Sequence, residues 1–414
     1  MRVKAAGLCG IAIGSLALGM TGGVQAEDSI GAALTGGKVS LDLRYRYEQV
    51  DQDKLPKKAN ASTLRTALGY TTGKFYDFSA MVEFENVSVL GAEHYNSTVN
   101  NKAAQYATVV DPKSTELNQG YLSYTGLSDT TMQLGRQRIT LDNQRFVGNS
   151  GWRQNEQTFN GFEVVNKSLP DTQITYAYLT DANRVTGDDA SNGDLRMKSH
   201  IINVAYSGLG FGALTGYAYL LDNGNIANQV LLGPASASTQ TLGLRFNGAT
   251  KMNDDLALLY TAEYARQGDY ADNPASYHVN YLLGELGATF TGITVKYGYE
   301  KLGSDRTHAV QTPLATLHAF NGWADMFLTT PTNGLVDQYL SVGAKPMDIN
   351  LAAVYHDFAT DKGAGDYGKE WDLMASKTFE KKYTLGAKYA NFSADSASAY
   401  VDTKKFWLWG EVKF

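Results

Sequence analysis

The sequence predicts a single all-β fold, a transmembrane antiparallel barrel of about eighteen strands with short turns at one end and long loops at the other. Three observations support this prediction: the composition, the alternation of apolar with polar residues along the chain, and the lengths of the segments between the expected strands. Of the 414 residues, 19% are charged, below the roughly 25% typical of soluble domains. Aromatic residues make up 11% of the chain, which argues against disorder. After residue 26 no run of eighteen or more apolar residues occurs, which excludes an ordinary transmembrane helix.

The first 26 residues are expected to form a secretory signal that is removed, leaving 27–414 as the barrel. Arg2 and Lys4 precede the apolar stretch 8–20, and the small residues Val24 and Ala26 suit signal peptidase. Cys9, the single cysteine, lies within this segment. We therefore expect the exported chain to have neither disulfides nor thiol chemistry.

Alternation with a period of two runs along the chain. In residues 39–48 every odd position is apolar or aromatic and every even position is polar or charged, the pattern of a strand with two different faces. Segments of about ten residues with one apolar face are typical of outer-membrane barrels. The expected strands are 38–49, 63–72, 77–88, 115–125, 130–141, 158–167, 172–182, 199–207, 211–221, 239–248, 254–266, 277–290, 293–302, 334–344, 347–358, 370–379, 383–393 and 404–414.

The connections between these strands alternate in length. Tight turns such as 126–129 and 291–292 contain turn-forming residues, whereas 89–114, 142–157, 183–198, 222–238 and 303–333 are long. Short periplasmic turns and long extracellular loops have this asymmetry in bacterial barrels. The chain ends on Phe414, which resembles the signal read by the barrel-assembly machinery. We therefore expect the outer membrane of a Gram-negative bacterium, with its lipid and lipopolysaccharide as partners.

Two segments carry a family resemblance. The first runs from Gly135-Arg136-Gln137-Arg138-Ile139 through 142–148 to 152–159, and the second covers 318–328 with Thr330-Pro331 and 334–337. Both resemble the alginate-export family of proteobacterial outer-membrane porins, over most of the mature chain. The resemblance implies an eighteen-stranded barrel with an electropositive lumen, whose arginines at 136, 138, 145 and 153 would contact anionic solute. The short turn 380–382 cannot plug a pore, which favours a diffusion porin over a dedicated exporter.

Charged residues of the strands are expected to face the lumen. An Arg or Lys on the lipid face at mid-bilayer depth costs about 2–4 kcal/mol, and guanidinium groups suit carboxylate solutes. Nine of the twelve arginines after residue 26 precede residue 200, so one wall is expected to be basic. The alternative is that these arginines pair with carboxylates and hold the barrel shape, and both roles stay open. The candidate pore-lining and solute-binding residues are Arg44, Arg46, Arg65, Glu83, Glu85, Arg136, Arg138, Arg145, Arg153, Arg245, Glu263 and Lys296.

The long segment 303–333 is expected to be an ordered loop, because it is rich in proline and aromatic residues. A constriction folded into the pore and an external cap are equally compatible with the sequence. The constriction candidates within it are His318, Asn321, Trp323, Asp325 and Phe327.

These patterns predict a water-filled channel for passive diffusion of small hydrophilic or anionic solutes. Export of an anionic polysaccharide such as alginate is the alternative within transport, and a scaffold or adhesin presenting 89–114 and 303–333 is the alternative outside it. No Gly-x-Ser-x-Gly elbow and no metal-binding histidine spacing occurs, so we expect no enzyme, no metal and no cofactor. A net charge of −6 argues against nucleic acid. Monomer and trimer stay open.

Overall fold

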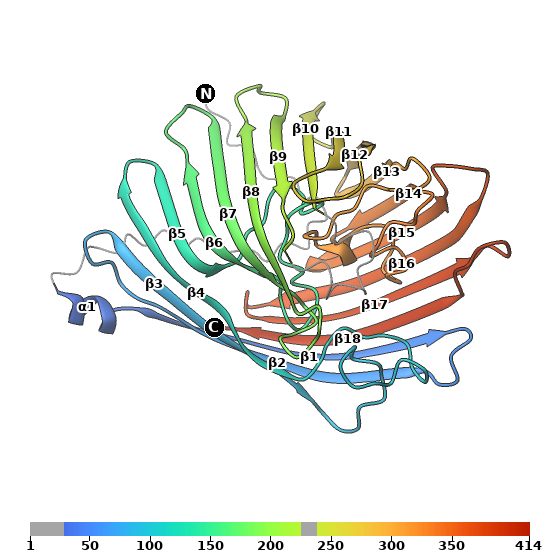
Figure 1. The fold of residues 1–414 in the computed structure, drawn as a ribbon, viewed down its shortest axis with the longest axis horizontal. Helices are drawn as coiled ribbons and strands as arrows, with labels where there is room; N and C mark the ends of the chain where they lie inside the picture. The colour runs from blue at the N-terminus through green and yellow to red at the C-terminus, as the bar shows by residue number, and fades with distance from the viewer. Residues whose placement is uncertain (1–28, 225–237) are drawn as a thin grey trace.

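The computed structural model describes residues 29–224 and 238–414, in which eighteen strands form one antiparallel sheet. Each strand pairs with its neighbours in chain order, and pairing of the first strand with the last closes the barrel (Figure 1). The expected signal segment lies outside the described residues. The elements are α1 (Ile30–Thr35), β1 (Lys38–Gln52), β2 (Ala59–Thr71), β3 (Phe78–Val89), β4 (Ser114–Leu127), β5 (Thr130–Gln137), β6 (Thr158–Asn166), β7 (Thr172–Asn183), β8 (Asp194–Tyr206), β9 (Ala213–Leu221), β10 (Thr239–Lys251), β11 (Leu256–Asp269), β12 (His278–Phe290), β13 (Ile293–Leu302), β14 (Leu335–Ala344), β15 (Ile349–Ala359), β16 (Asp366–Phe379), β17 (Tyr383–Ala394) and β18 (Thr403–Lys413).

The structure confirms the predicted barrel, and each expected strand overlaps an observed one. Four boundaries were wrong by four or five residues. Strand β2 begins at Ala59, not at 63, and β16 begins at Asp366, not at 370. Strand β5 ends at Gln137, not at 141, because the chain turns into the lumen there and buries Ile139 and Leu141. Strand β8 begins at Asp194, not at 199, because its pairing with β7 continues beyond an irregularity after Leu179.

The two faces of each strand differ as the alternation requires. On β10, Leu244 is 60% exposed and lies opposite Tyr264. The next residue, Arg245, lies opposite Glu263 and is buried inside the barrel. Since successive side chains of a strand point to opposite faces, an apolar band surrounds the barrel and the charges gather within it.

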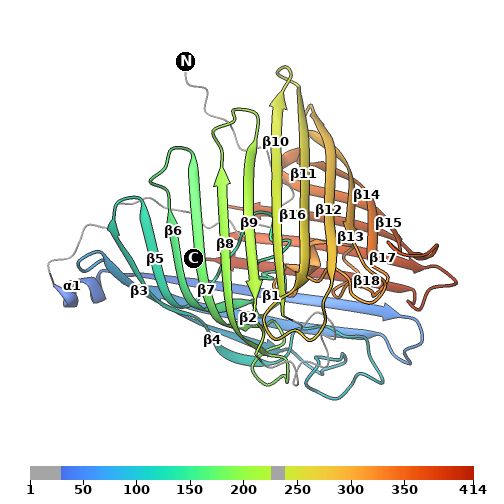
Figure 2. The ribbon, with the colours of Figure 1, turned by 45° about the horizontal axis from the view of Figure 1, so that its top comes forward.

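The two ends of the barrel also differ. One end carries tight turns such as Thr291-Gly292, whose φ angles of 46° and 83° suit a two-residue hairpin turn. The other end carries the long connections, of which two matter most here, L3 (138–157) and L7 (303–334). The barrel wall and these inner segments can be followed in Figure 2. Helix α1 lies at the short-turn end, where the Ala33 carbonyl accepts from the Gly73 N–H at 2.8 Å.

The largest apolar cluster of the described residues lies inside the barrel. Phe146 and Val147 of L3 and Leu314 and Trp323 of L7 are buried in it together with inward-facing strand residues. Since a wide barrel would otherwise enclose an aqueous channel, packing of these loops on the inner wall narrows the lumen. In the described ranges no helix is long and apolar enough to span a membrane.

Replacing Leu244 with arginine tests the outward assignment. We expect L244R to destabilise the folded barrel in lipid by about 2–4 kcal/mol, the cost of a cation at mid-bilayer depth on the lipid face. Urea unfolding in phosphatidylcholine vesicles measures this difference. The control is T261K, whose inward side chain lies opposite Glu285 and should change stability little. Equal loss of stability in both variants would contradict the assigned faces.

Candidate functional site

Loops L3 and L7 join inside the lumen. Val147 and Leu314 form a parallel β-bridge, and the Gly148 N–H donates to the Leu314 carbonyl at 2.9 Å. The Thr316 N–H donates to the Gln144 carbonyl at 3.0 Å. Backbone pairing of this kind makes the two loops one structural unit, although they are far apart in the sequence.

Buried ion pairs attach this unit to the wall. Asp325 of L7 accepts from His318 Nδ1 at 2.6 Å, from Arg153 Nη2 of L3 at 2.7 Å and from Lys405 Nζ of β18 at 2.7 Å. Burial would raise the pKa of Asp325, but His318, Lys405 and Arg153 outweigh it and hold this pKa well below its usual range. We call Asp325, His318, Arg153 and Lys405 the loop clamp.

The tip of L7 rests on carboxylates of the inner wall. The Trp323 N–H donates to Asp372 Oδ2 of β16 at 3.1 Å, and Asn321 Nδ2 donates to Glu300 Oε2 of β13 at 2.6 Å. The ring of Phe327 packs on Phe358, with centroids 4.6 Å apart. Of the two arrangements that the sequence left open, L7 therefore adopts the inward one.

Aromatic and cationic side chains pack beside the clamp. Trp152 of L3 stacks on His318 with ring centroids 4.9 Å apart, and the Arg46 guanidinium lies 4.1 Å from the Trp152 ring centroid. Lys388 Nζ of β17 lies 3.6 Å from the ring centroid of Trp323. Such desolvated cation–π contacts are worth about 2 kcal/mol each, and this layer fills the lumen next to β17, β18 and β1.

Most of the predicted lumen arginines are buried and paired. Arg65 is 2% exposed and contacts Glu85, Asp42 at 2.8 Å and Glu156 at 2.8 Å. Five further inward arginines are also buried, and each pairs with a carboxylate. These pairs are Arg44–Glu411 at 4.0 Å, Arg46–Asp111 at 3.8 Å, Arg145–Glu300 at 2.8 Å, Arg153–Glu48 at 2.9 Å and Arg245–Glu263. The arginine-rich wall is therefore matched by carboxylates.

Arg138 differs from these arginines. Its Nε and Nη2 contact Glu156 and Glu83, yet 31% of its side chain is exposed. Burial would raise the pKa of Glu156, but Arg138 and Arg65 lower it to about 2. The guanidinium is thus held by two fixed carboxylates, and its Nη1 has no hydrogen-bond partner among the described residues. One edge of Arg138 remains open to the lumen.

Arg136 is not a lumen residue, contrary to the sequence prediction. It lies opposite Gly120 and Asn160 on the face that carries the exposed Leu134. Its Nη1 donates to the Leu117 carbonyl at 2.8 Å. Side chains of β5 point alternately outward and inward as far as Gln137, and the chain turns into the lumen only after that residue. Arg136 therefore lies on the outer face of the wall, whereas Arg138 lies on the inner side. The place of Arg136 near the strand end lets its guanidinium reach the membrane interface.

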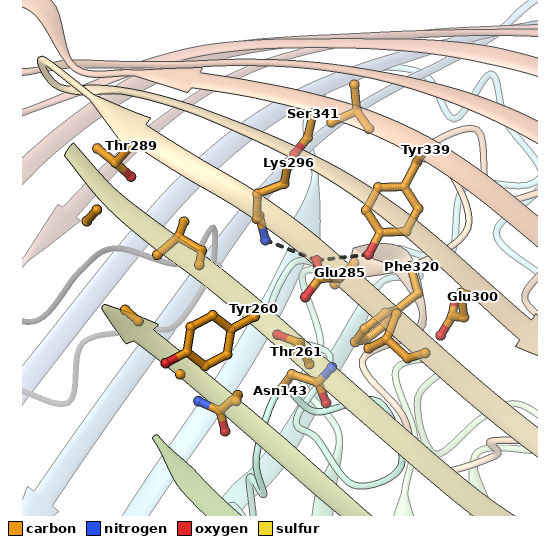
Figure 3. Close-up of a pocket in the computed structure, with 18 of the residues that line it drawn as sticks. Asn143, Tyr260, Thr261, Glu285, Thr289, Lys296, Glu300, Phe320, Tyr339 and Ser341 are labelled. Carbon is orange, nitrogen blue, oxygen red and sulfur yellow. Dashed lines mark hydrogen bonds and ion pairs between the residues drawn. The ribbon is translucent and has the colours of Figure 1, made fainter. Parts of the chain in front are cut away.

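A cavity of about 1080 Å³ extends from the short-turn end, at Asp255 and Gly292, to L3 and L7. Its wall comes from β10–β15, and Phe320 and Asn143 lie at its loop side (Figure 3). Figure 3 shows Glu285 between two partners. Lys296 Nζ lies 3.1 Å from Glu285 Oε1, and the Tyr339 hydroxyl donates to the same oxygen at 2.9 Å.

Sequence reasoning found Lys296, Arg245 and Glu263 but missed other charged residues here. Glu285 could have been found, because it alternates with the outward-facing Leu282 and Leu286 on β12. Asp142 carries no such signal, since it lies on a loop. In the part of the chain that the structure describes, no group of three or more His, Cys, Asp or Glu side chains could hold a metal ion.

A closed barrel of eighteen strands with an apolar outer band, ion-paired interior and loops folded into the lumen is an outer-membrane β-barrel of the porin type. The family model described as alginate export matches residues 37–304, and the chain belongs to this family. The outer membrane of a Gram-negative bacterium is its location.

Solved structures confirm the fold. OccAB4 of Acinetobacter baumannii superposes with a TM-score of 0.72 at 12% identity, covering 91% of this chain and 98% of that one. OccK9 (OpdG) of Pseudomonas aeruginosa superposes with a TM-score of 0.70 at 14% identity, covering 92% of this chain and 100% of that one. OpdK of the same organism, solved with vanillate, superposes with a TM-score of 0.69 at 13% identity, covering 92% of this chain and 99% of that one. No curated protein matches the sequence.

Removing the clamp carboxylate should release L7. In D325N the cations Arg153 and Lys405 lose their shared partner, a change that typically costs about 3–5 kcal/mol for a buried pair. We expect faster proteolytic cleavage within 303–334 and noisier single-channel currents. The control is D305N on the same loop, where the carboxylate is partly exposed and pairs with His308 at 3.2 Å. Unchanged cleavage in D325N would show that the clamp does not hold the loop.

Proposed function

We propose that the protein is a passive diffusion channel for small hydrophilic solutes that carry a carboxylate. The observation that supports this most is the open edge of Arg138, exposed by 31% in a lumen where the other inward arginines are buried. A guanidinium binds carboxylate through paired, charge-assisted hydrogen bonds. Glu83 and Glu156 fix its position, so little conformational entropy is lost when a solute arrives. No energy input is implied.

The loops favour small solutes over a polymer. L3 and L7 are joined by backbone pairing and attached through the loop clamp, and the cavity beneath them measures about 1080 Å³. That volume is close to the upper limit of about 1,000 Å³ for sites that bind a single small molecule. Family membership supports a second candidate, the export of an anionic polysaccharide, which would require L3 and L7 to separate.

Arg138 and Arg136 form a matched pair of variants. We expect R138Q to lower the anion-to-cation permeability ratio about fivefold, because a unit charge about 4 Å away contributes about 1 kcal/mol even in water. R136Q removes the same charge from the opposite face of the wall and should leave the ratio unchanged. Reversal potentials in planar bilayers under a KCl gradient measure both. A similar effect of the two variants would contradict the proposed role of Arg138.

The wild-type channel separates the remaining candidates. Block of the current by uronate oligomers, together with loss of that block in R138Q, would favour the polysaccharide exporter. Conductance without such block would favour the diffusion channel. No conductance in any purified preparation would contradict both and leave the scaffold or adhesin.

A further inference from the structure

Arg184, the first residue after β7, is a buried arginine without a carboxylate partner. It is 8% exposed, yet among the described residues no Asp or Glu forms an ion pair with it. The other buried arginines of the described ranges each contact a carboxylate, and they are Arg44, Arg46, Arg65, Arg145, Arg153 and Arg245. Because an uncompensated buried charge is strongly unfavourable, Arg184 departs from the rule that the rest of the lumen follows.

Arg184 lies on the inner face of the wall, at the end that carries the long loops. Its N–H donates to the Gly193 carbonyl at 2.7 Å, a bond that continues the ladder between β7 and β8 by one residue. Since alternate side chains of a strand share a face, Arg184 faces the same side as Ala182 and Leu195. Both of these residues belong to the apolar cluster inside the barrel.

The loop that begins with Arg184 is held in place through its main chain. The Val185 carbonyl accepts from Asn155 Nδ2 of L3 at 3.4 Å, and the Asp188 N–H donates to Glu116 Oε1 of β4 at 3.1 Å. These bonds do not involve the Arg184 side chain, and its Nη1 is buried without a hydrogen-bond partner among the described residues. A guanidinium with unused donors therefore lies beside L3.

No nearby charge compensates this guanidinium. Burial lowers the pKa of Arg184 to about 10, and no neighbouring carboxylate raises it. Asp188 and Asp189 belong to the same loop, but among the described residues neither pairs with Arg184. The segment 225–237, which lies outside the described residues, contains neither Asp nor Glu. The negative charge that Arg184 requires is thus not supplied by these parts of the chain.

We propose that Arg184 is the centre of a binding site for a small oxyanion, a carboxylate or phosphate group, at the long-loop end of the lumen. A planar guanidinium donates two parallel hydrogen bonds to such a group, whereas chloride, a single atom, cannot accept both in that geometry. The bound oxyanion supplies the missing negative charge. The inference goes beyond the proposed function, because it concerns stable occupancy rather than passage and does not involve Arg138.

R184M tests whether the guanidinium lacks a partner within the protein. In detergent, with chloride as the small anion of the buffer, we expect R184M to raise the Tm by about 2 °C or more, because methionine removes the cost of an unpaired buried charge. R65M removes a guanidinium that is paired with Glu85 and should lower the Tm. Circular dichroism during heating measures both. A lower Tm in R184M would overturn the inference.

Acetate and inorganic phosphate, added separately at constant ionic strength, test the ligand. We expect at least one of them to raise the wild-type Tm saturably, as a ligand of the folded state does. A response to acetate alone assigns a carboxylate, and a response to phosphate alone assigns a phosphate group. R184M should lose the response, and R184K, which keeps the charge without the planar pair of donors, should weaken apparent binding about tenfold.

The matched control for the anion response is R306M. Arg306 is an exposed arginine of L7 at the same end of the barrel, so this variant loses the same charge and should respond like wild type. Equal anion responses in wild type and R184M would overturn the inference. The absence of any wild-type response to acetate and to phosphate would overturn it as well.

Discussion

Buried ion pairs between the loops and the wall are the interaction on which the rest of the structure depends. Charges inside a barrel lose part of their hydration, and their attraction offsets that loss only when partners are close and well oriented. Asp325 meets this condition with two cationic partners, Arg153 of L3 and Lys405 of β18, and a hydrogen bond from His318 of L7. Backbone pairing between L3 and L7 then makes each loop depend on the attachment of the other.

This constraint also decides which charges are free to act on a solute. Because buried arginines such as Arg65 and Arg145 need carboxylate partners, they contribute to the shape of the lumen rather than to a long-range field. Of the predicted lumen arginines, Arg138 keeps one edge open, and it lies at the start of the packed loop L3. Arg138 directly precedes the buried Ile139 of L3, so the packing that narrows the lumen also leaves one edge of this guanidinium open.

The strands could be predicted from the sequence, because lipid and lumen impose opposite demands on successive residues and so produce the period of two. The fold of the loops could not. Contacts such as Val147 with Leu314 join distant segments without any periodic signal. Arg136 and Arg138 belong to the same motif and are two residues apart, a spacing that would place both on one face of a continuous strand. They lie on opposite faces because the chain turns inward between them. Inspection of residue types alone found both arginines and could not separate them.

Hydrogen exchange of the loop amides tests most directly the central claim that L3 and L7 form a fixed, inward-folded unit. In the purified, detergent-solubilised protein, the amides of Gly148 and Trp323, bonded to Leu314 and Asp372, should exchange as slowly as amides of the barrel strands. Exchange as fast as that of the exposed turn at 252–255 would contradict the claim and would mean that the loops do not form the constriction.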